Sequence, residues 1–281
     1  MEKFIELVVH THVGSLVEHP LRGRGELKEI DGRIEAEIRR GRVFPAFALV
    51  GWRWIARNPI AVAVPILLPF FFLYFLHLIS QPKYFPLEVA GAMLFTTQNI
   101  GSWCLGDASE LRLEMRLQEL FIASPLGRVR YLFGIAISNL IPAMPALVIL
   151  GVILSFVTRV SLSAWFILGA SIFAVWLLYS AIGLAISSRV RSQMEVWPVG
   201  SLVFTALGIF SPLYYPLSIL PPAWQAAAHF LPATYAALLV QGALGFTSAS
   251  VSEMLLNSAL LVLSTVIGLA IVLHLYTWRE R

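Results

Sequence analysis

Charged residues are scarce in this sequence. Asp, Glu, Lys and Arg make up 13% of its 281 residues, about half of the roughly 25% that is typical of soluble domains. Hydrophobic residues make up 58%. This composition excludes an ordinary soluble domain and indicates a membrane protein.

Motifs that carry catalytic or metal chemistry are also missing. The single cysteine, Cys104, cannot form an intramolecular disulfide. No glycine is followed by lysine, so the chain cannot build a phosphate-binding P-loop. No Cys or His cluster has zinc spacing, and His10 and His12 are better explained as a solvated pair. We therefore expect no enzyme activity, no metal and no cofactor in this chain.

Long apolar runs are what the sequence does contain. A membrane-spanning helix needs about 20 mostly apolar residues. Six segments meet or approach that length: residues 60–79, 87–106, 132–157, 162–187, 196–215 and 254–276. The second carries Glu88 and a polar centre, and the fifth contains Pro198 and Pro212. Pro142 and Pro145 should kink the third. We predict an all-α membrane protein with six transmembrane helices.

Basic residues predict the orientation of these spans. With six spans both termini share one side, and 18 of the 20 Lys and Arg residues fall on that side. The opposite side keeps only Lys83 and Arg159. Because basic residues near span ends stay in the cytoplasm, both termini are expected there, in a multi-pass protein of the cell membrane. The net charge of +4 then reflects topology and requires no nucleic acid.

The N-terminal region divides into two parts. Residues 1–43 form a mixed-charge cytoplasmic segment. Residues 44–58 place Phe44, Phe47, Gly51 and Trp54 on one helical face, which predicts an amphipathic helix in the membrane interface. The alternative is that this helix is the inner end of the first span. Residues 59–281 form the six-span transmembrane domain.

A charged segment separates the second and third spans. Residues 107–123 alternate apolar and charged positions, as strands do, but Leu, Glu, Met, Arg and Gln favour a helix. We predict a cytoplasmic helix that shows Leu113, Leu117, Leu120 and Phe121 on one face. Ser124 and Pro125 are then expected as the N-cap and first residue of the third span.

An apolar but proline-rich stretch follows the fifth span. Its prolines allow no straight span before residue 254, and the charge pattern places the stretch outside. Non-helical backbone at membrane depth must be buried in protein or face water. We predict two short re-entrant helices, residues 223–230 and 233–243, that enter the outer leaflet and return.

Uncharged polar residues lie inside the spans and need partners there. Either they hold helices together or they line a path for cargo. The candidates for a path are Thr97, Gln98, Asn99, Asn139, Thr205, Tyr214 and Tyr215. The absence of charge argues against an ion pathway and suits an amphipathic cargo.

The six predicted spans carry two motifs, one between the second and third spans and one between the fifth and sixth. In this order the motifs resemble those of the ABC-2 type permeases, the membrane subunits of a class of ATP-driven exporters. The first motif consists of Glu114, Glu119, Leu120, Ala123, Ser124, Pro125, Leu126, Arg128, Tyr131, Leu132 and Gly134. The second consists of Pro216, Ser218, Leu220, Pro221, Trp224, Pro232, Thr234 and Tyr235, with one extra residue before the Trp. The chain also lacks a Gly-Thr that the family often carries in the cytoplasmic helix.

The resemblance implies a permease that exports an amphipathic, lipid-like, drug-like or glycan cargo. Two copies of a separate ABC ATPase would bind ATP and Mg, a second permease copy or a paralogue would complete the path, and membrane lipids would surround the complex. Residues implied in ATPase coupling are Glu114, Leu117, Glu119, Leu120, Phe121, Ser124, Pro125 and Arg128. The outer re-entrant segment would use Pro216, Pro221, Trp224, Pro232 and Tyr235. The alternative is a membrane anchor that docks a cytoplasmic protein without transport.

Overall fold

The computed structural model describes residues 33, 43–57, 59–114 and 127–276. These residues form nine α-helices and two short 3₁₀ helices, and no strand occurs among them. The all-helical prediction is therefore confirmed for this part of the chain. Three helices, α7 (Arg128–Val157), α8 (Leu162–Ser187) and α12 (Val251–Leu275), are long and apolar enough to cross a membrane.

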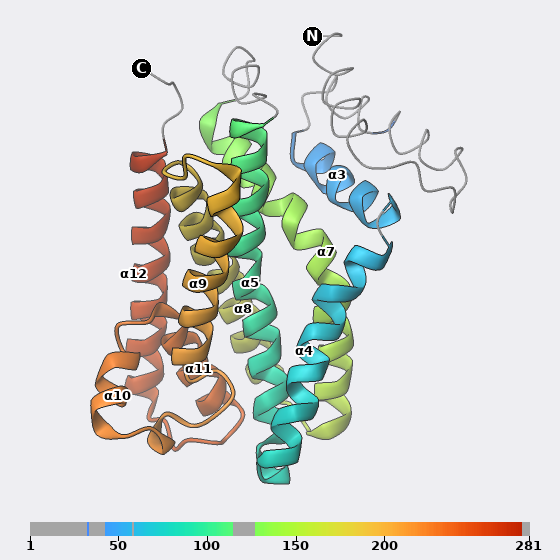
Figure 1. Ribbon diagram of the computed structural model, residues 1–281. Helices are drawn as coiled ribbons and strands as arrows, with labels where there is room; N and C mark the ends of the chain where they lie inside the picture. The colour runs from blue at the N-terminus through green and yellow to red at the C-terminus, as the bar shows by residue number, and fades with distance from the viewer. Residues whose placement is uncertain (1–32, 34–42, 58, 115–126, 277–281) are drawn as a thin grey trace.

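The first two helices cover the ranges predicted for the interfacial helix and the first span. They are α3 (Val43–Arg57) and α4 (Pro59–Ile79), and Figure 1 shows that they run in different directions. α3 packs across α7, where the Phe47 ring lies against Gly134. Apart from Arg33 and Val43, the predicted N-terminal segment lies outside the described residues.

The central helix is longer than predicted. After a 3₁₀ turn, η1 (Pro82–Tyr84), α5 (Phe85–Leu113) runs on past Gly106. Residues 107–113 were expected to open a separate cytoplasmic helix, and this expectation is corrected. The stretch DASELRL has neither proline nor glycine to stop α5, and the Glu114 N–H still donates to the Glu110 carbonyl at 3.1 Å. The rest of the expected helix, residues 115–123, lies outside the described residues.

The third long helix starts later than predicted. Gly127 is the N-cap of α7, so Ser124 is not, and the expected start at Ser124 is corrected. Ser124 and Pro125 themselves lie outside the described residues. α7 stays helical through Pro142 and Pro145, and Figure 1 shows it changing direction along its length. Each proline removes a main-chain hydrogen bond, which explains the bend.

The bounds of the remaining helices differ little from the prediction, except at the C-terminal end of α9. α8 has the predicted bounds, whereas α9 (Gln193–Phe210) ends before the predicted residue 215. Ser211 has an extended backbone because Pro212 follows it, and a proline ring disfavours helical geometry in the residue before it. Tyr214 and Tyr215 therefore lie in an irregular segment. After η2 (Leu217–Ile219), two short helices, α10 (Pro222–Ala228) and α11 (Pro232–Ala243), occupy the predicted re-entrant region.

α5 lies in the middle of the bundle. It packs most extensively on α8 and α7 and also contacts α9, and most of its residues are buried. α12 differs from α5: it lies at the edge of the bundle (Figure 1), buries only four residues and exposes a largely apolar surface. An apolar surface of this kind requires lipid or protein cover. α10 and α11 lie at the end of the bundle opposite α3 (Figure 1).

Candidate functional site

Three of the predicted path residues lie in the middle of α5. Thr97 is fully buried and its hydroxyl donates to the main chain one turn earlier, at 2.8 Å. Gln98 is also fully buried, and its amide donates to the Phe204 carbonyl on α9 at 3.1 Å. Asn99 is half-buried. Gln98 thus joins two helices, whereas Asn99 lies on a partly open side of α5.

α5 and α8 approach each other through glycine. A Cβ atom added to Gly183 on α8 would collide with the Gly101 carbonyl oxygen on α5. Small residues allow helix backbones in membranes to come this close. The polar layer of α5 is therefore held against α8 by main-chain contact.

Asn139 on α7 contacts the C-terminal part of α5. Its side-chain amide donates to the Asp107 carboxylate at 2.8 Å and to the Ile135 carbonyl at 3.1 Å. Sequence reasoning placed Asp107 only at a span boundary and did not pair it with Asn139. No spacing rule relates the two, since they lie on different helices.

The other path candidates do not share one surface. Thr205 is exposed on α9, whereas Tyr214 is buried with its ring centroid 4.8 Å from that of Phe72 on α4. The Tyr215 carbonyl accepts from the Gln241 amide at 3.1 Å. Gln241, which sequence reasoning missed, is fully buried and also donates to the Pro212 carbonyl at 2.9 Å. It holds the irregular segment after α9 against α11.

The proline-rich segment after α9 is folded against the end of that helix. The rings of Trp224 and Phe210 are parallel, and their centroids lie 5.6 Å apart. The Tyr235 hydroxyl donates to the His229 carbonyl at 2.6 Å. A groove of about 550 Å³ is lined by Phe210, Tyr215, Leu220, Pro221, Trp224, Ala227, Ala228 and Leu231. Of the predicted outer residues, Pro221 and Trp224 line this groove, Pro216 is buried below the surface, and Pro232 and Tyr235 belong to α11.

Arg112 connects α5 to the turn between α8 and α9. Its guanidinium donates to the Ser187 carbonyl at 2.7 Å and to the Val190 carbonyl. Ser187 is the last residue of α8, so its carbonyl has no donor within that helix. Sequence reasoning counted Arg112 only among the basic residues that set the expected orientation.

Arg128 connects the start of α7 to the end of α12. Its guanidinium donates to the Val272 carbonyl at 2.9 Å and lies 6.0 Å from the Tyr276 ring centroid. Of the other predicted coupling residues, Glu114 is exposed at the C-cap of α5. The following lie outside the described residues: Leu117, Glu119, Leu120, Phe121, Ser124 and Pro125.

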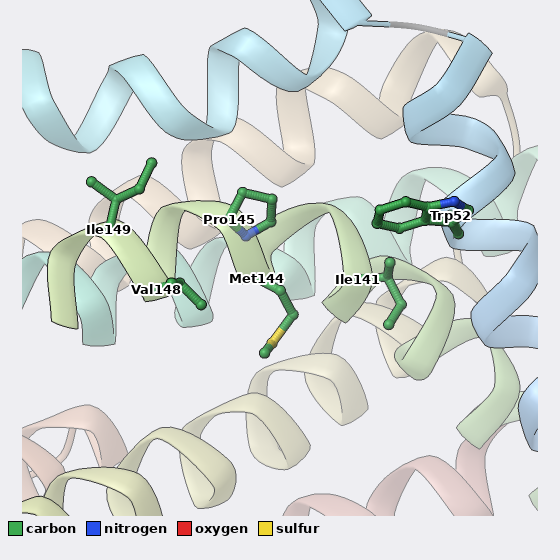
Figure 2. A pocket seen from close by; sticks show the side chains of 6 residues that line it. All are labelled: Trp52, Ile141, Met144, Pro145, Val148 and Ile149. Atoms are coloured by element: carbon green, nitrogen blue, oxygen red, sulfur yellow. The ribbon is translucent and has the colours of Figure 1, made fainter. Parts of the chain in front are cut away.

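A second groove, of about 520 Å³, lies between α3 and α7. Figure 2 shows Trp52 reaching from α3 over the turns of α7 that carry Ile141 and Pro145. Its lining is apolar throughout, so it offers a site for hydrocarbon and not for polar chemistry. Within the described residues, no group of three or more His, Cys, Asp or Glu side chains is placed to hold a metal ion.

Comparison with known proteins identifies the domain. The family model described as ABC-2 type transporter matches residues 42–244, a range that runs from α3 through α11. A search of curated proteins found no match. The matched range covers most of the chain, including both ends of the segment between α5 and α7. The chain therefore belongs to the ABC-2 type transporter family and is a membrane transport component.

Proposed function

We propose that this chain is the permease of an ATP-driven exporter and that α4, α5, α7, α8, α9 and α12 all cross the cell membrane. The observation that carries the proposal is the family match over residues 42–244, because ABC-2 transporters work with an ABC ATPase. The packing of α4 and α5 on the long apolar helices, and of α9 on α5, supports six spans.

The proposed orientation rests on arginines at one end of the bundle. The helix ends that meet through Arg112 and Arg128 also carry Arg130, Arg189 and Arg191. The opposite end of the described bundle carries Lys83 and Arg159. By the positive-inside rule the arginine-rich end faces the cytoplasm, together with both chain termini.

The ATPase is proposed to dock on the segment between α5 and α7. Leu117, Leu120 and Phe121 supply apolar contacts there, and Glu114 and Glu119 supply acidic ones. Each of two ATPase copies holds its own ATP and Mg. Since α5 continues to Leu113 without a break, docking displaces the ends of both α5 and α7, and not α7 alone.

The cargo is proposed to be amphipathic, lipid-like, drug-like or a glycan, and to move along an interface with a second permease copy or a paralogue. The spans offer uncharged polar groups such as Asn99 and Thr205 that are not fully buried. Exposed apolar side chains on α9 and α12 supply surface for a neighbouring subunit or for lipid.

The double substitution Leu120→Asp and Phe121→Asp tests the docking proposal. We expect the ATPase to stop co-purifying with the full-length permease and ATP-driven export from vesicles to stop as well. Met194→Asp places one such negative charge on an exposed apolar residue of the same end and should leave both unchanged. Normal ATPase binding and normal export by the double variant would disprove the docking role. ATPase binding by the unaltered chain without cargo movement would favour the anchor function instead.

A further inference from the structure

The C-terminal end of α8 has its last four carbonyls paired, and one of the donors comes from another helix. The hydroxyls of Ser187 and Ser188 donate to the Leu184 and Ala185 carbonyls, both at 2.7 Å. The Arg189 N–H donates to the Ile186 carbonyl at 2.8 Å. The remaining carbonyl, on Ser187, accepts from Arg112 of α5. Arg112 therefore completes the end of a helix that is far from it in sequence.

The same arginine also holds the chain just beyond α8. Its second acceptor, the Val190 carbonyl, lies in the turn that leads into α9. A helix C-terminus carries partial negative charge, so a guanidinium is favoured there by charge as well as by hydrogen bonding. Any displacement of the α5 end must move this turn or break both bonds.

The C-terminal end of α12 also contacts an arginine, here from α7, at the Val272 carbonyl that already accepts from the Tyr276 N–H. Arg128 donates to the Val272 carbonyl in the last turn of α12 and lies over the Tyr276 ring. One turn further along α7, Tyr131 is fully buried with its ring centroid 6.4 Å from that of Tyr276.

These two arginines stand on either side of one stretch of chain. Arg112 lies just before residues 114–127, and Arg128 lies just after them. The segment is thus attached at one end to α8 and at the other to α12, and α8 and α12 pack on each other. Arg112, Arg128, α8 and α12 thus form a connected set of contacts on the two sides of the segment.

We propose that Arg112 and Arg128 are positioning residues that transmit movement of residues 114–127 to the C-terminal ends of α8 and α12. The proposal rests on the proposed docking of an ATPase on that segment. Without the two arginines, ATPase movement would still reach α5 and α7 through the main chain. It would no longer reach α8 and α12 through bonds to their ends.

The first test uses Arg112→Gln and Arg128→Gln in the full-length permease, purified with the ATPase that accompanies it. We expect ATPase binding to stay within about twofold of the unaltered chain, while the amount of cargo exported per ATP hydrolysed falls on the order of tenfold. Arg189→Gln is the matched control, because this arginine is exposed in the turn after α8. It should leave both quantities unchanged.

Lysine variants separate positioning from folding. Arg112→Lys keeps the charge but replaces the planar fork that bonds two carbonyls, so it should fold normally and recover only part of the export per ATP. If Arg112→Gln fails to give a monodisperse complex, the comparison of Arg112→Lys with Arg189→Lys decides. Equal export per ATP in those two variants would overturn the role of Arg112.

The second test measures a distance that loss of the bond should change. With Cys104→Ser as background, spin labels at Val129→Cys and Leu273→Cys mark the exposed sides of the first turn of α7 and the last turn of α12. With Arg128 present, the distance between labels should be the same with and without ATP. With Arg128→Gln, ATP should shift or broaden it.

The outcomes distinguish the inference from the proposed function. If Arg112→Gln and Arg128→Gln export normally and the label distances match those of the unaltered chain, the inference is wrong while the exporter function stands. If the unaltered chain binds no ATPase or exports nothing, the proposed function and the inference fail together.

Discussion

At the scale of single residues, several polar side chains in this bundle bond to main-chain carbonyls of other helices and turns. Gln98 and Gln241 do so in the interior, and Arg112 and Arg128 do so at the helix ends. A buried polar group without a partner costs stability, so each of these bonds also fixes where two chain segments meet. Such residues position helices even where they touch no cargo.

The contact between Gly101 and Gly183 gives a prediction at this scale. Gly183→Ala places a methyl group against the Gly101 carbonyl, so α5 and α8 must separate. Overpacking of this kind costs about 1–3 kcal/mol. Thermal unfolding of the detergent-solubilised protein should show a clear loss of stability.

The control for that prediction lies on the same helix. A Cβ atom at Gly169 meets nothing within 4 Å, so Gly169→Ala should not destabilise the protein. If the two alanine variants unfold at the same temperature, the close approach of α5 and α8 does not exist in the protein.

The sequence allowed the polar residues to be found but not their partners. Thr97, Gln98 and Asn139 stand out because polar groups inside apolar runs need bonds. Gln98 bonds to a main-chain carbonyl and Asn139 to a carboxylate on other helices, and no local pattern points to these acceptors. For the same reason Arg112 was read only as a cytoplasmic charge.

At the scale of helices, boundaries could be predicted where local chemistry sets them. α8 has its predicted bounds because Ser161 caps its start and turn residues follow its end. α9 ends at Phe210 because Pro212 disfavours helical geometry at Ser211, a signal that outweighs the apolar run beyond it. α5 was cut short in the prediction because charge was taken as its end, although nothing in residues 107–113 breaks a helix.

The start of α12 supplies a prediction at this scale. Ser250 and Glu253 form a capping box, in which the Ser250 hydroxyl accepts from the Glu253 N–H at 3.2 Å and Glu253 accepts from the Ser250 N–H at 2.7 Å. Ser250→Ala should destabilise the protein by about 1 kcal/mol, the usual value of an N-cap. Ser264→Ala, which removes only an internal helix bond, should cost less. Equal melting temperatures would show that the cap does not hold α12.

At the scale of the whole molecule, the more apolar helix α12 is less buried than the more polar helix α5. α12 is strongly apolar and mostly exposed, whereas α5 is polar in its middle and mostly buried. A soluble protein would place the apolar helix inside. The reverse order fits a bundle with lipid or a second subunit around it, and it explains why apolar length alone finds α7, α8 and α12 but not α5.

The two ends of α5 test the proposed topology of the whole molecule. Gln81 and Glu114 are exposed just before and just after the helix. In a Cys104→Ser background, a membrane-impermeant maleimide should label Gln81→Cys in intact cells and Glu114→Cys only after permeabilisation. Labelling of both from the same side would mean that α5 does not span and that the six-span proposal is wrong.

The enclosure of α5 also bears on how the protein enters the membrane. The centre of α5 carries four uncharged polar residues, Thr96, Thr97, Gln98 and Asn99. During insertion no other helix yet surrounds these polar groups, so α5 should partition into lipid less readily than α7 or α12. A link of only five residues separates the end of α4 from the start of α5. The two helices are therefore suited to insert as one hairpin, with α5 screened until α7 and α8 arrive.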